Sequence, residues 1–332
     1  MLDTPPEPTP PSLEPSPLRG RGALVAGLVA ALVFAFGIYG ATRLWAPDSG
    51  MLLIAFLLGA PVAASMIAVW VSDPRGAKPT RAHLGTGAMT ITLMLVAAAI
   101  VLREGAVCVI MVAPIFYGAG LLAAWVTGAG LRYRGSRTLC LVILILPLIG
   151  VPAEADHPAT AQTRWVTTTT TIDAPPATVW NRLVDIRTIA DSEQQWNFTH
   201  DLVGIPRPRD ARMQGSGVGA VRHLTWARDV RFEEHITEWR PDRSLAWTFE
   251  VGPEASTRML DEHLRVNSAY LRLEEGRYTL EATPEGGTRL VLTTRYWMRT
   301  PINAYAAWWG GVFLGDFHRN VLGVIKARAE QA

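Results

Sequence analysis

Four uninterrupted apolar stretches dominate the first half of the sequence. They cover residues 22–42, 51–71, 84–102 and 105–131, and none of them contains Asp, Glu, Lys, Arg or His. About 20 consecutive apolar residues in a helix are enough to cross the hydrocarbon core of a bilayer. A fifth and shorter stretch, at 138–153, has a core of Leu, Ile and Val with charged residues on both sides. We therefore expect a membrane region at 22–153 with about five helical spans, preceded by a disordered, proline-rich tail at 1–21.

The apolar spans limit the classes of membrane function. Ionisable residues inside spans normally mark ion or proton pathways, so their absence argues against a coupled transporter or pump. Pro61, Pro114 and Pro147 interrupt spans two, four and five. Broken helices around a site are one interpretation of these prolines, but simple kinks are favoured because packed membrane helices tolerate proline. The glycines at 118–120 and 128–130 are typical of close helix packing.

Basic residues in the short loops predict the orientation of the chain. Cytoplasmic loops carry an excess of Lys and Arg. The richer loops are those with Arg19 and Arg21, with Arg75, Lys78 and Arg81, and with Arg132, Arg134 and Arg137. We therefore expect a cytoplasmic N-terminus, in a bacterial inner membrane. Five spans then place the C-terminal domain in the periplasm or outside the cell, whereas a re-entrant fifth stretch would leave that domain in the cytoplasm.

The pattern changes after a linker at 154–163, and residues 164–332 show the alternation of a soluble domain. Trp165 to Ile172 is a β-branched run that predicts a strand. Asp173 is expected to cap a helix whose first turn holds Pro175 and Pro176. Further strands are expected at about 198–205, 217–226, 229–239, 244–251, 268–283 and 288–299, and residues 255–267 form a loop or a short helix. Thr300 and Pro301 predict the start of a long helix that ends near Ala329.

This order resembles the START-related helix-grip superfamily (SRPBCC), which contains polyketide cyclases, dehydrases and lipid-transfer proteins. The resemblance rests on IDAPPATVWNRLVD, on GSGVGAVRHLTW, on FEEHITEWRPDRSLAWTFEV and on the aromatic C-terminal helix. It covers the second half of the chain only. The fold class that follows is an α-helical membrane bundle joined to an α+β helix-grip domain, in which a curved antiparallel sheet wraps a long helix.

The resemblance also implies an apolar cavity between sheet and helix that takes hydrophobic ligands. The many Trp and Tyr residues of this half agree with it, although aromatic side chains fill ordinary cores as well. The residues expected at the cavity are Trp226, Phe232, Glu234, Trp247, Tyr278, Trp309, Phe313, Asp316, Phe317 and Asn320.

Polar residues within apolar patterns are the candidates for chemistry. Asp316 and Asn320 are four residues apart on the apolar face of the terminal helix, where an unpaired polar group is costly. Asp316 is either a polar anchor with acid or base character, or a structural hydrogen-bond partner. His223 and His235 are further candidates for proton transfer. Because side chains alternate along a strand, His223 and its neighbour Arg222 point to opposite faces.

Other classes are disfavoured. A net charge of +2 without a basic stripe gives no reason to expect nucleic acid as a partner. The seven histidines never occur at the short spacings of a metal site, so we expect neither a metal nor another cofactor. The two cysteines lie in apolar runs and indicate no disulfide framework.

Three functions remain open. The first is membrane-anchored binding or transfer of a lipid or other hydrophobic small molecule, which requires no chemistry. The second is an enzyme of the cyclase or dehydrase kind, with Asp316 or a histidine as acid or base. The third is a sensory or assembly module that contacts another membrane protein.

Overall fold

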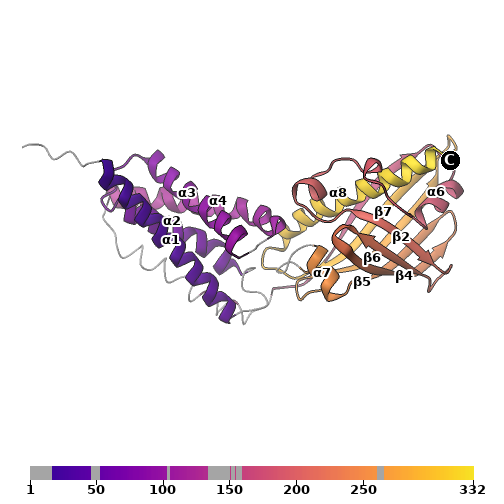
Figure 1. Ribbon diagram of the computed structural model, residues 1–332, viewed down its shortest axis with the longest axis horizontal. Helices are drawn as coiled ribbons and strands as arrows, with labels where there is room; N and C mark the ends of the chain where they lie inside the picture. Colours follow the sequence, from indigo (N-terminus) through magenta and orange to yellow (C-terminus); the bar gives the residue numbers. More distant parts are fainter. Residues whose placement is uncertain are drawn as a thin grey trace, which may run out of the picture. The chain divides into compact units, whose positions relative to one another are not determined.

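The computed structural model describes residues 17–45, 53–102, 105–133, 150, 154, 159–259 and 265–332. Four long helices come first (Figure 1): α1 (Pro17–Trp45), α2 (Ile54–Ser72), α3 (Thr80–Val101) and α4 (Ala106–Tyr133). In this described part of the chain, these four helices are long and apolar enough to cross a membrane. The fifth predicted span, 138–153, lies outside the described residues except for Gly150.

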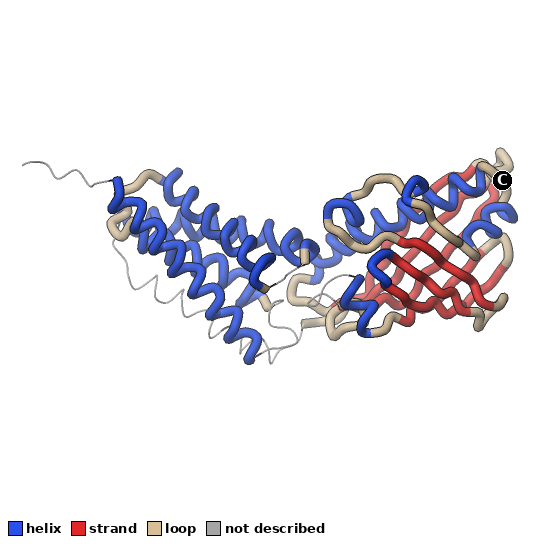
Figure 2. Tube along the Cα trace, viewed as in Figure 1, coloured by secondary structure: helices blue, strands red, loops and turns tan. Residues whose placement is uncertain are grey.

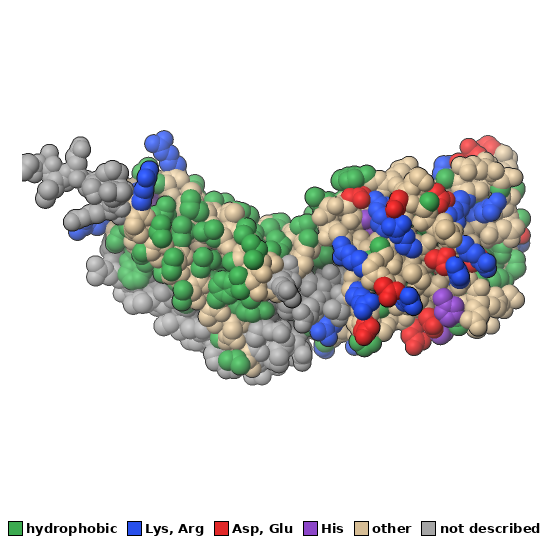
Figure 3. Space-filling view, viewed as in Figure 1, with side chains coloured by type: hydrophobic (Ala, Val, Ile, Leu, Met, Phe, Trp, Pro, Cys, Tyr) green, Lys and Arg blue, Asp and Glu red, His purple; other side chains and the backbone are tan. Residues whose placement is uncertain are grey.

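The surfaces of the two halves differ as their sequences predict. Hydrophobic side chains cover much of the visible face of the four helices, whereas acidic and basic side chains are scattered over the C-terminal domain (Figure 3). Glycines of α4 allow close packing, as expected. A Cβ atom at Gly120 would lie 2.6 Å from Ile91 Cδ1, and one at Gly128 would lie 2.0 Å from His83 Nδ1. Both glycines therefore let α3 and α4 approach more closely than a larger residue allows.

A seven-stranded antiparallel sheet forms the C-terminal domain, in the order β1-β7-β6-β5-β4-β3-β2. Helix α8 (Asn303–Glu330) packs lengthwise on β1 and β7 (Figure 2). Helix α6 (Pro176–Leu183) follows β1, and α7 (Pro253–Met259) follows β5. The strands are β1 (Gln162–Ile172), β2 (Pro208–Gln214), β3 (Val221–Trp226), β4 (Val230–Arg240), β5 (Ser244–Glu250), β6 (Leu271–Ala282) and β7 (Thr288–Met298). A sheet that grips a long terminal helix is the arrangement that the sequence predicts.

Two local predictions in this domain are wrong. The strand expected at 198–205 is instead a short π-helical turn, η3 (Phe198–Leu202), whose first residues are held by Asn197 because its side chain accepts from the His200 N–H. Strand β2 is absent from the predicted strands, and it begins at a proline. Strand β2 is an edge strand of the sheet, and an edge is where a proline without an N–H is tolerated.

The helix starts also differ from expectation. Asp173 does not cap α6; Pro175 is the N-cap residue and no side chain caps the helix. The two prolines still begin the helix, since Pro176 occupies its first turn, where a missing N–H costs little. Helix α8 starts at Asn303, after Thr300 and Pro301, and the Asn303 side chain accepts hydrogen bonds from the N–H and the hydroxyl of Thr300.

The threonine run of β1 ties the sheet to α8. Its side chains alternate between exposed and half-buried. Thr168 lies on the half-buried side, with its Oγ1 3.2 Å from His318 Nδ1, and Thr294 Oγ1 of β7 lies 2.9 Å from His318 Nε2. A hydroxyl can donate or accept, so both nitrogens of a neutral imidazole are satisfied. Burial lowers the pKa of His318 to about 4, which keeps the ring neutral at pH 7.

We expect the C-terminal domain to lose stability as the pH falls from 6.5 to 4. His318 titrates near 6.5 in the unfolded chain and near 4 in the folded domain, so the unfolded state binds more protons between these values. When complete, the loss is about 3 kcal/mol. Thermal unfolding of the full chain in detergent, followed by tryptophan fluorescence across this window, measures it. His318→Asn keeps polar contacts but cannot titrate, and an unchanged pH slope in that variant would contradict the assignment.

Candidate functional site

Strands β3 to β6 present aromatic side chains to the interior. The ring centre of Trp226 lies 5.3 Å from that of Phe232 and 5.1 Å from that of Phe317 on α8. Trp247 and Tyr278 lie 5.1 Å apart. Aromatic contacts at these distances stabilise a core beyond their buried area, and aromatic side chains are also common in the lining of ligand pockets.

A glycine makes room for one of these rings. Gly276 of β6 lies opposite Trp247 of β5 in the strand register. A Cβ atom at Gly276 would lie 2.3 Å from carbon atoms of the Trp247 ring. The indole therefore lies against the bare backbone of the neighbouring strand, and no larger residue fits at this position without moving it.

An ion pair is buried beside this ring. Arg222 of β3 and Glu234 of β4 are direct partners in the strand register, and both are buried. Arg222 Nε donates to Glu234 Oε2 at 2.6 Å, and Nη1 donates to the Leu183 carbonyl at 3.1 Å. The guanidinium carbon lies 4.6 Å from the ring centre of Trp247. A buried charge needs a counter-charge and hydrogen bonds, and each charge of this pair has both.

Burial changes the proton affinities in this interior. It raises the pKa of the Glu234 carboxyl, and the Arg222 guanidinium acts in the opposite direction. Burial also raises the pKa of the Tyr278 hydroxyl, again with Arg222 opposing it. Tyr278 consequently keeps its proton at neutral pH and presents a neutral hydroxyl.

The first half of α8 is covered by the η3 turn. The ring of Phe198 stacks on Trp309 and Phe313 of α8, at centre distances of 6.4 and 6.2 Å. Trp309 and Phe313 are themselves 5.2 Å apart and stacked. The aromatic face of α8 thus contacts both the sheet, through Phe317, and the loop segment that carries η3.

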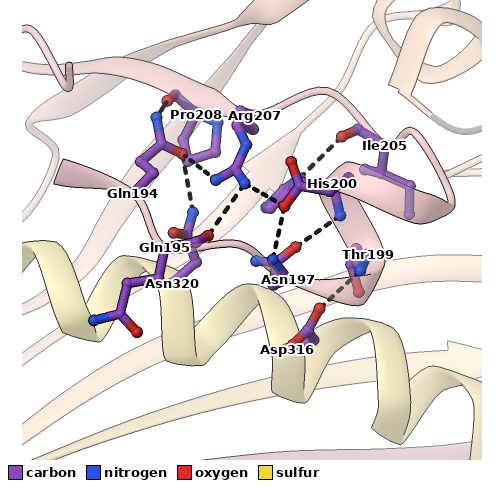
Figure 4. A network of polar contacts seen from close by, with 11 residues as sticks. Gln194, Gln195, Asn197, Thr199, His200, Ile205, Arg207, Pro208, Asp316 and Asn320 are labelled. Atoms are coloured by element: carbon purple, nitrogen blue, oxygen red, sulfur yellow. Dashed lines mark hydrogen bonds and ion pairs between the residues drawn. The ribbon is translucent and has the colours of Figure 1, made fainter. Parts of the chain in front are cut away.

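Asp316 and Asn320 hold this loop segment onto α8 (Figure 4). Asp316 Oδ2 accepts from the Thr199 backbone N–H at 2.8 Å, and its Oδ1 accepts from Arg319 at 3.2 Å. Asn320 Nδ2 donates to Gln194 Oε1 at 3.0 Å. Both carboxylate oxygens of Asp316 therefore have hydrogen-bond donors, and the structural interpretation of Asp316 is the one that its contacts favour.

His200 enters the interior from the same segment, and no sequence pattern had indicated it as a candidate. Its Nδ1–H donates to the Ile205 carbonyl at 2.9 Å, which leaves Nε2 as the unprotonated nitrogen. Burial lowers the pKa of His200, so the ring is neutral at pH 7. Its centre lies 6.2 Å from that of Phe317. Because residues 198–205 were predicted to form a strand, His200 was not considered as a site residue. Asn197 was the available signal, since Asn is a common N-cap residue and indicates the start of a helical turn.

Several buried polar atoms around Phe317 have no hydrogen-bond partner within the described part of the chain. They are the indole N–H of Trp226, Nε2 of His200 and the side-chain oxygen of Asn320. Asn320 lies one helical turn beyond Phe317 on α8. Leaving one such group unpaired costs about 1–3 kcal/mol, so each of these atoms is a candidate contact for a polar group of a ligand or for water.

The ten residues predicted at a cavity all lie in the interior of the domain. Eight are buried, and Phe313 and Phe317 are half-buried. Glu234 points inward with Phe232, as its spacing predicts. In contrast, His223 and His235 lie on the outer face, with side chains 45% and 41% exposed, while Arg222 points inward. The opposite orientation of Arg222 and His223 is as predicted.

One open groove of about 580 Å³ lies elsewhere, near the first residues of β1 and α8. Its lining includes Thr160, Gln162, Thr300, Asn303 and Tyr305. None of the ten predicted cavity residues lines it. The groove and the aromatic interior are therefore two separate features of the domain.

Comparison with known proteins finds similarity in structure only. Neither a family model nor a curated protein matches the sequence. An aromatase/cyclase from a Streptomyces species has 18% identity and a TM-score of 0.32, over 51% of this chain and 95% of its own. A norcoclaurine synthase mutant from Thalictrum flavum has 10% identity and a TM-score of 0.34, over 52% and 97%. An uncharacterized protein from Rhizobium leguminosarum has 16% identity and a TM-score of 0.31, over 52% and 98%.

Proposed function

We propose that the C-terminal domain binds a hydrophobic small molecule or lipid that carries a polar group able to donate and accept hydrogen bonds. The observation that supports this most strongly is the set of unpartnered polar atoms around Phe317, from Trp226, His200 and Asn320. A hydroxyl group would accept from the Trp226 N–H and donate to His200 Nε2. The surrounding rings would contact the apolar body of the ligand.

The membrane helices give this binding a location. A hydrophobic ligand is concentrated in the bilayer, and four apolar helices would keep the binding domain beside it. By the distribution of Lys and Arg, the N-terminus lies in the cytoplasm. With the predicted fifth span at 138–153, the domain lies on the outer side of the membrane, whereas the four helices alone would leave it in the cytoplasm. A reporter fused after Ala332 that is active only in the cytoplasm should stay inactive; activity would place the domain on the inner side.

Replacing Trp226 with phenylalanine is expected to weaken ligand binding about two- to tenfold. The change keeps an aromatic ring but removes the N–H, and one hydrogen bond contributes about 0.5–1.5 kcal/mol. Binding of a fluorescent fatty alcohol to the full chain in detergent is the measurement. Trp165→Phe is the matched control, because Trp165 lies on β1 with 62% of its surface exposed. Equal affinities for the two variants would contradict the role of Trp226.

A second function is favoured by one feature, the free Nε2 of His200. A neutral imidazole with an unpaired nitrogen in an apolar interior can accept a proton from a bound molecule. A dehydrase-type reaction would use His200 as the base, whereas the sequence suggested Asp316 or another histidine for this role. The two functions differ in one result: an enzyme converts the bound molecule to a product that lacks one water, whereas a binding protein returns it unchanged.

A further inference from the structure

Histidine and carboxylate side chains gather on the outer face of the sheet, away from the interior site. Glu233 and His235 belong to β4 and are two residues apart, so they share a face. Glu250 of β5 is the direct partner of Glu233 in the strand register. His235 Nε2 lies 2.8 Å from Glu250 Oε2 and 3.6 Å from Glu233 Oε2. One possible ligand atom from each of the three residues lies within 4.8 Å of the other two.

A fourth residue holds this cluster in place. His223 of β3 is the direct partner of Glu233, and its Nδ1 lies 3.1 Å from Glu233 Oε1. Its Nε2 lies 2.7 Å from Gln214 Oε1, so the ring bridges Gln214 and Glu233. Contacts of this kind orient the ligands of metal sites from outside the coordination sphere. The contact with His223 thus fixes one carboxylate oxygen of Glu233, while the other oxygen faces His235 and Glu250.

The charges around the cluster are unusual for this sheet. Other carboxylates of the sheet pair with arginine, as Glu238 does with Arg277 and Glu281 with Arg289. Within residues 159–259 and 265–332, the ion-pair partners of Glu233 and Glu250 are histidines only. Like charges directly opposite on neighbouring strands destabilise a sheet. A divalent cation between them would offset the charges of both carboxylates.

We propose that Glu233, His235 and Glu250 bind a divalent transition-metal ion of the Zn²⁺ type. One nitrogen and two carboxylate donors suit zinc, whereas calcium takes oxygen ligands only. Bonds of about 2.0–2.2 Å in a tetrahedral site place neighbouring donor atoms roughly 3.3–3.6 Å apart. The separations of 2.8 and 3.6 Å bracket that value. Three protein ligands leave a fourth position for water or another small ligand.

Spacing along the chain could not indicate this site. The donors come from neighbouring strands, and only the pairing of β4 with β5 brings Glu250 to Glu233 and His235. The expectation that no metal binds rested on the lack of short histidine spacings and of a carboxylate cluster that completes a ligand set, and such patterns detect sites within one helix or one strand. A site built across strands has no such signature.

Zinc titration of the full chain tests the proposal. Protein purified in detergent without a histidine tag, and stripped with a chelator, is titrated with zinc chloride by calorimetry. We expect one saturable zinc site per chain, which His235→Gln abolishes. His223→Phe should weaken the affinity about 10–100-fold, because His223 only orients Glu233. The control is Glu281→Gln, which removes an exposed carboxylate that is paired with arginine, and it should leave zinc binding unchanged.

Two further readouts separate this site from general effects. Cobalt bound in place of zinc should give the visible absorption of a tetrahedral ion in the wild type and not in His235→Gln. The melting temperature without metal should be alike in all variants, because the substituted side chains are on the outer face. The absence of a saturable site in the wild type, or the same affinity in His235→Gln, would overturn the proposal.

Discussion

Replacing Arg222 with methionine is expected to lower the free energy of unfolding of the C-terminal domain by about 3–5 kcal/mol. The substitution leaves the Glu234 carboxylate buried without its counter-charge, and the Leu183 carbonyl loses a donor. For a domain of this size, the melting temperature should fall on the order of 10 °C. Tryptophan fluorescence during thermal unfolding of the full chain in detergent measures this, since Trp247 contacts the guanidinium.

The double variant Arg222→Met with Glu234→Leu tests whether the loss of stability comes from the carboxylate that is left unpaired. Removing both charges of a buried pair together is often neutral or stabilising. We therefore expect the free energy of unfolding of the double variant to lie within about 2 kcal/mol of the wild-type value. Arg289→Met is the surface control: Arg289 pairs with Glu281 and both are about half exposed, so the loss should be about 1 kcal/mol at most. A double variant that is as unstable as Arg222→Met alone would show that the two charges are not coupled.

Gly276→Ala should destabilise the domain by about 1–3 kcal/mol, as overpacking of a core does. The new Cβ atom would lie 2.3 Å from the Trp247 ring, so the indole has to leave its place against β6. Its contacts with Tyr278 and with the Arg222 guanidinium then weaken. Thermal unfolding measures the loss of stability, and the tryptophan emission reports the displaced ring.

The matched control for this substitution is Gly252→Ala. No atom lies within 4 Å of a Cβ built at Gly252, so the same chemical change should have little effect there. Binding of the fluorescent fatty alcohol should also weaken in Gly276→Ala, because Trp247 forms part of the aromatic wall. Wild-type stability in Gly276→Ala would mean that the ring does not lie where the structure places it.

The parts of the fold that the sequence predicted are those set by local pattern. The threonine run at 167–171 indicated a strand because β-branched residues favour extended backbone, and it lies in β1. The aromatic face that includes Phe313 and Phe317 predicted α8. Alternation along β4 placed Glu234 inward with Phe232, and it is buried there. In each of these cases the signal lies within one element.

The parts that the sequence did not predict depend on pairing between distant elements. The partner of Glu234 is Arg222 on another strand, and nothing in either strand alone identifies the pair. His200 lies in a segment that was expected to be a strand. That segment instead begins with a π-helical turn whose N-cap residue is Asn197. Asp316 accepts from Thr199, which is distant in sequence, so its structural role could be stated from the sequence only as one of two alternatives.

The proposed interior site is built from side chains of several distant elements. The sheet supplies Trp226 and the buried ion pair, α8 supplies Phe317 and Asn320, and the η3 segment supplies His200. Asp316 accepts from the Thr199 N–H and Asn320 donates to Gln194, so both residues hold the segment that carries His200 on α8. Binding and local order of residues 194–205 should therefore change together in variants of these two residues.

Mass spectrometry of the molecules that the purified full chain retains tests the central claim most directly. The protein is extracted in mild detergent, washed, and its bound molecules are extracted into organic solvent and identified. We predict one hydrophobic molecule with a hydroxyl or similar polar group, enriched over bulk membrane lipid, and depleted in Trp226→Phe relative to Trp165→Phe. The same bulk-lipid profile in the wild type and both variants would contradict the claim that the interior is a binding site.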